Sequence, residues 1–67
     1  MNKSEVEKYK NHNCKITYES LLLKKHIDAF GFVDMVKNNY VYYHNNTTLF
    51  RLPIKHIVNI EVSKIWK

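Results

Sequence analysis

Apolar and polar residues alternate along much of this chain, and alternation at every second position is typical of a β-strand with one buried face. In residues 14–19, Cys14, Ile16 and Tyr18 share one side. Residues 26–37 alternate over a longer run, with one predicted face formed by Ile27, Ala29, Gly31, Val33 and Met35. Phe30 and Phe32 fall on its other face. We therefore expect two strands here, each with a buried side.

The second half of the chain continues the extended pattern. Residues 40–44 are rich in aromatic and β-branched residues, residues 45–48 form a polar turn, and residues 49–52 resume a strand. Pro53 ends that strand because proline has no N–H to donate to a sheet. Ile54 and Ile57 lie three apart, as in a single 3₁₀ turn that buries one side. Residues 58–63 then alternate again, with Val58, Ile60 and Val62 predicted on the buried face.

Together these segments predict an all-β domain over residues 14–67, a small five-stranded barrel of the SH3-like or Sm-like kind with one 3₁₀ turn. Residues 37–39 form a second hairpin turn. Residues 20–25, with three leucines and two lysines, fit either a helical turn or an extended continuation. The only glycine, Gly31, lies inside a predicted strand, where glycine usually marks sharp curvature or a close backbone approach.

The two ends of the chain carry separate expectations. In residues 1–13, Ser4 precedes Glu5 and is a candidate N-cap. Val6 and Tyr9 lie three apart. These residues therefore form either a short helix that docks on the domain or a frayed polar tail. Near the other end, Trp66 either packs over the barrel mouth or contacts a partner.

Length and charge limit the classes of protein to which this chain can belong. A chain of 67 residues forms one domain, and no apolar run approaches the roughly 20 residues that span a bilayer. The charged N-terminus has no signal-peptide pattern, and the lone Cys14 fits a reducing compartment, so we expect a cytoplasmic protein without a membrane partner. A net charge of +5 favours a polyanionic partner, with nucleic acid first and an acidic protein surface second.

Three sequence segments resemble one known family. They are KITYE at 15–19, AFGFVDMV at 29–36 and LPIKHIVNIEV at 52–62. They are similar to the YolD-like family of small bacterial and phage proteins, whose pattern is a strand ending in Ile-Pro, a turn, and then Ile-x-x-Ile-Glu. Here the order is Leu52-Pro53, Ile57, Ile60 and Glu61, and most of the family's N-terminal helical extension is missing. The resemblance implies a regulatory or accessory protein of DNA transactions without catalysis.

The residues that usually carry catalysis or bind metals show no matching pattern. The four histidines lack the close pairs typical of zinc sites, so we expect no metal and no cofactor. Cys14 alternates with apolar neighbours, which favours a small core residue over a nucleophile. The carboxylates are scattered, and one glycine cannot form a phosphate-binding loop. We therefore expect a protein that is not an enzyme.

Aromatic and basic residues together suggest a nucleic-acid site. Bases stack on aromatic side chains, and lysine or arginine neutralises phosphates. The residues predicted to carry phosphate contacts are Lys24, Lys25, Arg51 and Lys55, with Tyr42 stacking on a base. Because alternate aromatics in a strand are usually core, one of Tyr42 and Tyr43 is expected to be buried. The alternative is a protein-binding module, for example a phage-encoded modulator of a host protein, acting through an aromatic patch or a sheet edge that also permits homo-oligomers.

Overall fold

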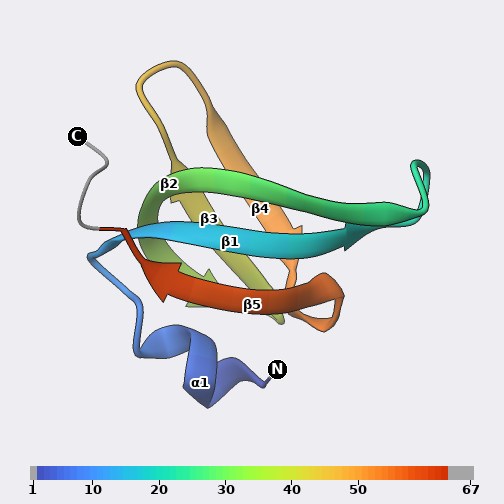
Figure 1. Cartoon of the computed structure of the whole chain (residues 1–67). Coiled ribbons are helices and arrows are strands. Elements are labelled where there is room, and N and C mark those ends of the chain that lie inside the picture. Colours follow the sequence, from blue (N-terminus) through green and yellow to red (C-terminus); the bar gives the residue numbers. More distant parts are fainter. Residues whose placement is uncertain (1, 64–67) are drawn as a thin grey trace.

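The computed structural model describes residues 2–63 and contains one antiparallel sheet (Figure 1). A short helix, α1 (Lys3–Glu7), precedes five strands: β1 (Asn13–Ser20), β2 (Lys25–Lys37), β3 (Tyr40–His44), β4 (Leu49–Pro53) and β5 (Ile57–Val62). A 3₁₀ turn, η1 (Ile54–His56), joins β4 to β5. The strand order is β4-β3-β2-β1-β5, so the last strand pairs with the first. The predicted β composition, the strand number and the 3₁₀ turn after Pro53 are confirmed.

Asparagine residues stabilise two of the three hairpin turns. Asn38 and Asn39 both have positive φ, 53° and 66°, as a two-residue type I′ turn between β2 and β3 requires. Between β3 and β4, the Asn45 side-chain oxygen accepts hydrogen bonds from the backbone N–H groups of Thr47 and Thr48, at 3.0 and 3.1 Å. Both turns lie where the sequence placed them.

The ambiguous segment between β1 and β2 is a turn rather than a helix. β1 extends to Ser20, residues 21–24 reverse the chain, and β2 begins at Lys25. The Leu23 N–H donates to the Ser20 hydroxyl at 3.1 Å, and Lys24 adopts positive φ of 54°. The three leucines are thus carried on the turn of a hairpin.

Gly31 lies where two strands approach too closely for a side chain. A Cβ atom there would lie 2.8 Å from the backbone oxygen of His44 and 2.8 Å from Cδ2 of Tyr43. Of the two meanings expected for this glycine, close backbone approach is therefore confirmed.

The alternation predicted for β2 ends at Val33. Between Val33 and Met35 the pairing with β3 shifts at a β-bulge, where one extra residue faces the partner strand. Met35, predicted to share a face with Val33, is consequently exposed, and Val36 packs against the core in its place. The prediction that Val33 and Met35 share a face was wrong because a bulge inverts the faces beyond it.

A bulge also corrects the prediction for β5. Thr17 pairs with Asn59 but Tyr18 pairs with Ile57, so Val58 is an extra residue and is 48% exposed. Val62, also predicted on the buried face, is 46% exposed on this edge strand. Ile57 and Ile60 are both buried, as is Ile54 of η1. The isoleucine spacing therefore predicted burial better than strict alternation did.

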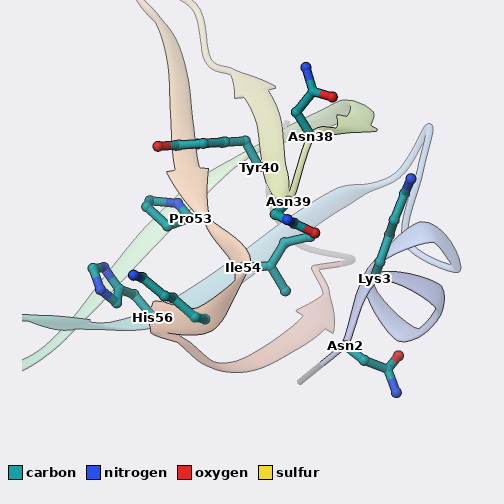
Figure 2. A pocket seen from close by; sticks show the side chains of 9 residues that line it. Asn2, Lys3, Asn38, Asn39, Tyr40, Pro53, Ile54 and His56 are labelled. Carbon is teal, nitrogen blue, oxygen red and sulfur yellow. The ribbon is translucent and has the colours of Figure 1, made fainter.

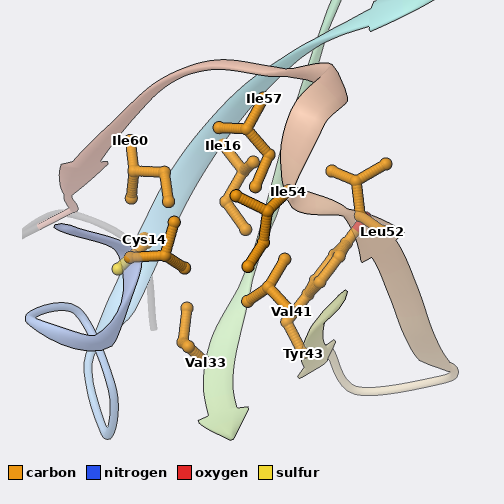
Figure 3. Close-up of a cluster of buried hydrophobic side chains, with 10 residues drawn as sticks. Cys14, Ile16, Val33, Val41, Tyr43, Leu52, Ile54, Ile57 and Ile60 are labelled. Carbon is orange, nitrogen blue, oxygen red and sulfur yellow. The ribbon is translucent and has the colours of Figure 1, made fainter. Parts of the chain in front are cut away.

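One apolar cluster holds the sheet and α1 together (Figure 3). Its buried members are Val6, Cys14, Ile16, Val33, Val41, Tyr43, Leu52, Ile54, Ile57 and Ile60. Val6 of α1 is among the fully buried side chains, and Tyr9 packs against the same cluster, so the N-terminal segment docks on the sheet. Trp66 lies outside the described residues.

The N-cap of α1 is Asn2 rather than Ser4. The Asn2 side chain accepts a hydrogen bond from the Glu5 N–H at 2.9 Å, and the Glu5 carboxylate accepts from the Asn2 N–H at 3.2 Å. These reciprocal bonds form a capping box. Ser4 instead donates its hydroxyl to the Asn2 side-chain oxygen at 2.9 Å. The sequence prediction therefore placed the start of the helix two residues too late.

Candidate nucleic-acid interface

A groove of about 730 Å³ lies between α1, the β2–β3 turn and the β4–η1 junction (Figure 2). It is lined by Asn2, Lys3, Asn38, Asn39, Tyr40, Pro53, Ile54, Lys55 and His56. Figure 2 shows Lys3 on one side of the groove and Pro53 and His56 on the other. Three segments that are distant in the sequence thus form one concave surface.

Backbone pairing brings two of these segments together. Tyr40 at the start of β3 pairs with Pro53 at the end of β4. The Ile54 N–H donates to the Asn39 carbonyl at 3.0 Å, which ties η1 to the type I′ turn. On the third side, burial of Val6 holds α1 against the sheet and places Asn2 and Lys3 at the groove. The shape of the groove therefore follows from the core and the turns.

The groove is lined by cationic, amide and aromatic side chains. Lys3 and Lys55 are exposed, and Tyr40 and His56 are half-buried. Its described lining contains two ammonium groups and no carboxylate. Asparagine side chains both donate and accept hydrogen bonds, and lysines bind phosphate oxygens. Such a surface suits an anionic ligand with hydrogen-bonding edges.

An aromatic and basic cluster continues from the groove onto the outer face of the sheet. The Arg51 guanidinium lies over the Tyr40 ring, 5.1 Å from its centroid, in a cation–π contact. Tyr42 pairs with Arg51 across β3 and β4 and is half-buried. Tyr40 therefore lies both in the groove and against Arg51, and Arg51 in turn lies beside Tyr42.

The outer face of the sheet continues beyond Tyr42 with a polar and aromatic arrangement. The His44 ring lies 5.4 Å from the Phe32 ring, centroid to centroid. Its Nδ1 atom is 2.7 Å from Oδ2 of Asp34 and 2.9 Å from Oδ1. The Asp34 carboxylate thus places negative charge on the β2 side of this face, whereas Arg51 and Lys55 lie on the β4 side. Basic side chains therefore lie on the β4 side of this face and in the groove, and the exposed Lys37 of β2, which pairs with Tyr40, adds another beside them.

The five predicted site residues fall into two groups. Lys55 lines the groove, and Arg51 and Tyr42 lie beside it through Tyr40. Lys24 and Lys25 lie instead at the β1–β2 turn, at the opposite end of β2 from Asn38. Lys24 and Lys25 do not line the groove.

The sequence did not point to four groove residues. Asn38 and Asn39 were assigned only to a turn, which their positive φ values explain. Nothing in the sequence marks Asn2 or Lys3, because their place in the groove depends on how α1 docks. The only sequence signal for these groove residues was the polar turn at residues 37–39, which directly precedes the aromatic strand at residues 40–44.

Tyr43 and Cys14 both belong to the core. Tyr43 is the buried member of the Tyr42–Tyr43 pair, as expected, and stacks on Phe50 with ring centroids 5.2 Å apart. Burial raises the pKa of its phenol, and Tyr18 contributes to the same shift. Burial also raises the pKa of the Cys14 thiol to about 11. A thiol with this pKa is protonated near neutral pH, so Cys14 has the character of a core residue.

Within residues 2–63, no three His, Cys, Asp or Glu side chains lie close enough to hold a metal ion together. No helix in this range is long and apolar enough to cross a membrane. Comparison with protein-family models, with curated proteins and with solved structures gives no match. The resemblance to YolD-like proteins therefore stays a prediction.

Proposed function

We propose that this protein is a small, non-enzymatic accessory protein that binds single-stranded nucleic acid, alone or within a nucleic-acid-processing complex. The strand passes through the groove between α1, the β2–β3 turn and η1. Lys3, Lys55 and Arg51 neutralise its phosphates. Tyr40 and Tyr42 supply aromatic surface for the bases. The observation that carries the proposal is the groove itself, which has two lysines and no carboxylate in its described lining.

Single-stranded nucleic acid fits this chemistry better than a rigid duplex does. Unpaired bases expose both their faces and their hydrogen-bonding edges, which aromatic rings and asparagine amides bind. The groove offers both groups within one concavity, beside a guanidinium that already contacts an aromatic ring. The net charge of +5 adds a general attraction for polyanions.

The proposed architecture is that of a small SH3-like or Sm-like barrel. The order β4-β3-β2-β1-β5, with a 3₁₀ turn before the last strand, supports this assignment. The bulges in β2 and β5 support it too, because bulges help a sheet to curve. In such a barrel the groove lies at one end, where α1, the β2–β3 turn and the β4–η1 junction come together.

A salt titration tests the proposed function. Labelled single-stranded and double-stranded oligonucleotides of equal length are titrated with the protein at several salt concentrations. We expect tighter binding of the single strand and a linear fall of log affinity with log salt. The slope should be about −0.7 for each phosphate neutralised. Absence of binding at low salt would refute the proposal.

Matched charge variants locate the site. Lys55→Gln and Lys3→Gln remove one groove cation each and should reduce the salt slope by about 0.7 each. Lys10→Gln removes the same charge from an exposed position outside the groove lining and serves as the control. Equal losses in all three variants would indicate a general charge effect and would contradict the assignment of the groove.

Tyr40 tests the aromatic part of the site. Tyr40→Phe retains the ring, whereas Tyr40→Ile replaces it with another strand-forming side chain. If a base stacks on this ring, only the isoleucine variant loses roughly 1–3 kcal/mol of binding free energy. Similar affinity for both variants would remove Tyr40 from the interface.

A protein-binding module is the second candidate, and the two open sheet edges favour it. β4 and β5 each have one strand neighbour, and the exposed side chains on them include Leu49, Phe50, Val58 and Val62. Such edges accept a strand from another chain. A pull-down from bacterial lysate with and without nuclease separates the candidates, because only a protein partner bound directly is retained after nuclease.

A further inference from the structure

The β1–β2 hairpin extends beyond the strands on both sides of it (Figure 1). β1 and β2 pair continuously from Asn13 with Phe32 to Ser20 with Lys25. β5 accompanies β1 only as far as Tyr18, and β3 pairs with β2 only from Phe32 onward. Residues 19–26 therefore project as a two-stranded arm, held by its own hydrogen-bonded ladder.

Three consecutive leucines occupy the end of this arm. Leu21, Leu22 and Leu23 are 66%, 89% and 55% exposed, and they form the largest run of adjacent exposed apolar side chains in residues 2–63. Isolated exposed leucines are common, but a contiguous apolar tip normally marks a binding surface. No described part of the chain covers it.

Basic residues directly follow the leucines. Lys24, Lys25 and His26 are all exposed, and the one acidic residue on the arm, Glu19, pairs across the ladder with His26. The arm therefore has apolar side chains at its end and basic side chains directly beside them. Lysine side chains extend along apolar surface while their ammonium groups stay in water. An anionic lipid surface has the complementary order, with negative headgroups outside and hydrocarbon inside.

We propose that residues 21–25 form a membrane-contact tip that inserts its leucines into an anionic lipid bilayer, with Lys24 and Lys25 at the lipid phosphates. Leu21, Leu22 and Leu23 occupy consecutive positions of a turn, and each is more than half exposed. A fluid hydrocarbon layer accommodates all three at once, whereas a protein pocket would have to enclose the whole tip. From the sequence we expected no membrane partner, because no apolar run is long enough to span a bilayer. A tip that enters only the membrane–water interface does not need a spanning segment.

This contact is independent of the proposed nucleic-acid function. The groove lies at the Asn38 end of β2, and the tip lies at its Lys25 end. The two sites share none of their residues. A protein with both would hold a nucleic acid at an anionic membrane surface, and each contact can fail without the other.

Vesicle flotation tests the proposal. The protein is mixed with vesicles of phosphatidylcholine and phosphatidylglycerol in equal parts, or of phosphatidylcholine alone, and floated through a density gradient. We expect flotation with the mixed vesicles and little with phosphatidylcholine. Leu22→Asn should weaken binding about tenfold or more, since it removes the most exposed leucine. The double variant Lys24→Asn, Lys25→Gln should weaken it about fivefold for each lysine.

A matched control and a position-specific probe complete the experiment. Leu49→Asn removes a leucine that is 69% exposed on β4, away from the tip, and should float like the unmodified protein. An environment-sensitive fluorophore attached through Leu22→Cys should shift to the blue with mixed vesicles, whereas the same probe at Leu49→Cys should not. Labelling is selective because Cys14 is buried.

The proposal is overturned if the unmodified protein does not float with mixed vesicles, if Leu22→Asn floats as well as Leu49→Asn, or if the probe at position 22 stays in water. If flotation is absent and the double lysine variant loses nucleic-acid affinity, the tip belongs to the nucleic-acid interface instead. Circular dichroism and a thermal melt of each variant check that the exposed substitutions leave the fold intact.

Discussion

Replacement of Gly31 by alanine should destabilise the protein, although alanine is usually the better strand residue. The added Cβ would lie 2.8 Å from the backbone oxygen of His44 and 2.8 Å from Cδ2 of Tyr43. The Tyr43 ring cannot move freely, because it is buried and stacked on Phe50. The backbone oxygen cannot move without shifting β3. Gly31 does not have positive φ, so the requirement is for space alone.

The magnitude follows from two opposing effects. Forcing a methyl group into a packed site typically costs about 1–3 kcal/mol. Replacing a glycine inside a strand by alanine returns roughly 0.5–1 kcal/mol of backbone entropy. The net loss is therefore about 0.5–2 kcal/mol of unfolding free energy, which for a domain of this size lowers Tm by roughly 2–16 °C.

The reverse substitution two residues away is the control. Ala29 lies on the same face of β2 and is only half-buried against the core. Ala29→Gly should also destabilise, by roughly 0.5–1 kcal/mol, so that alanine is preferred at 29 and glycine at 31. Urea unfolding followed by circular dichroism measures both values. A Gly31→Ala protein as stable as the original, or more stable, would refute the close-approach argument.

Three further predictions concern the turn, the thiol and the helix. Asn39→Ala should cost about 1 kcal/mol, because alanine is strained at the positive φ of this residue, whereas Asn39→Gly should preserve stability; equal urea midpoints for the two variants would contradict the type I′ turn. Since burial raises the pKa of Cys14 to about 11, the folded state holds the thiol proton more tightly than the unfolded state. Unfolding free energy should therefore fall as pH rises above about 9, and less so in Cys14→Ala. Iodoacetamide should label Cys14 in urea but hardly in buffer, and rapid native labelling would contradict its burial. Val6→Ala should cost roughly 2 kcal/mol, and an unchanged melting temperature would mean that α1 is not docked.

Periodicity predicted the strands well because most of them bury one face against a single core. It failed at Val62, which lies on an edge strand, and at Met35 and Val58, where the reason is the same in both places. A bulge is set by how two strands pair, and it changes which face a residue occupies without changing the residue's own hydrophobicity. Isoleucine spacing around Pro53 was more informative, since Ile54, Ile57 and Ile60 are all buried.

The candidate site was less predictable than the fold. Composition identified lysine, arginine and tyrosine as relevant residue types, but it could not say which of them converge. Lys55 and Tyr40 line the same groove because Pro53 pairs with Tyr40 across the sheet. Lys3 joins them only because α1 docks through Val6. Lys24 and Lys25 looked equivalent to Lys55 in the sequence, yet the length of the β1–β2 hairpin separates them from the groove.

The pairing of β5 with β1 has a consequence for how the chain reaches its folded state. β1 to β4 form successive hairpins from local contacts, but β1 gains its second neighbour only when β5 arrives from the far end of the domain. Contacts between such distant segments form late and slow the folding of small β-proteins. Until then Ile16, which pairs with Ala29 of β2 and with Ile60 of β5, lies on an edge strand beside an incomplete core. Intermediates that lack β5 should therefore be the aggregation-prone species.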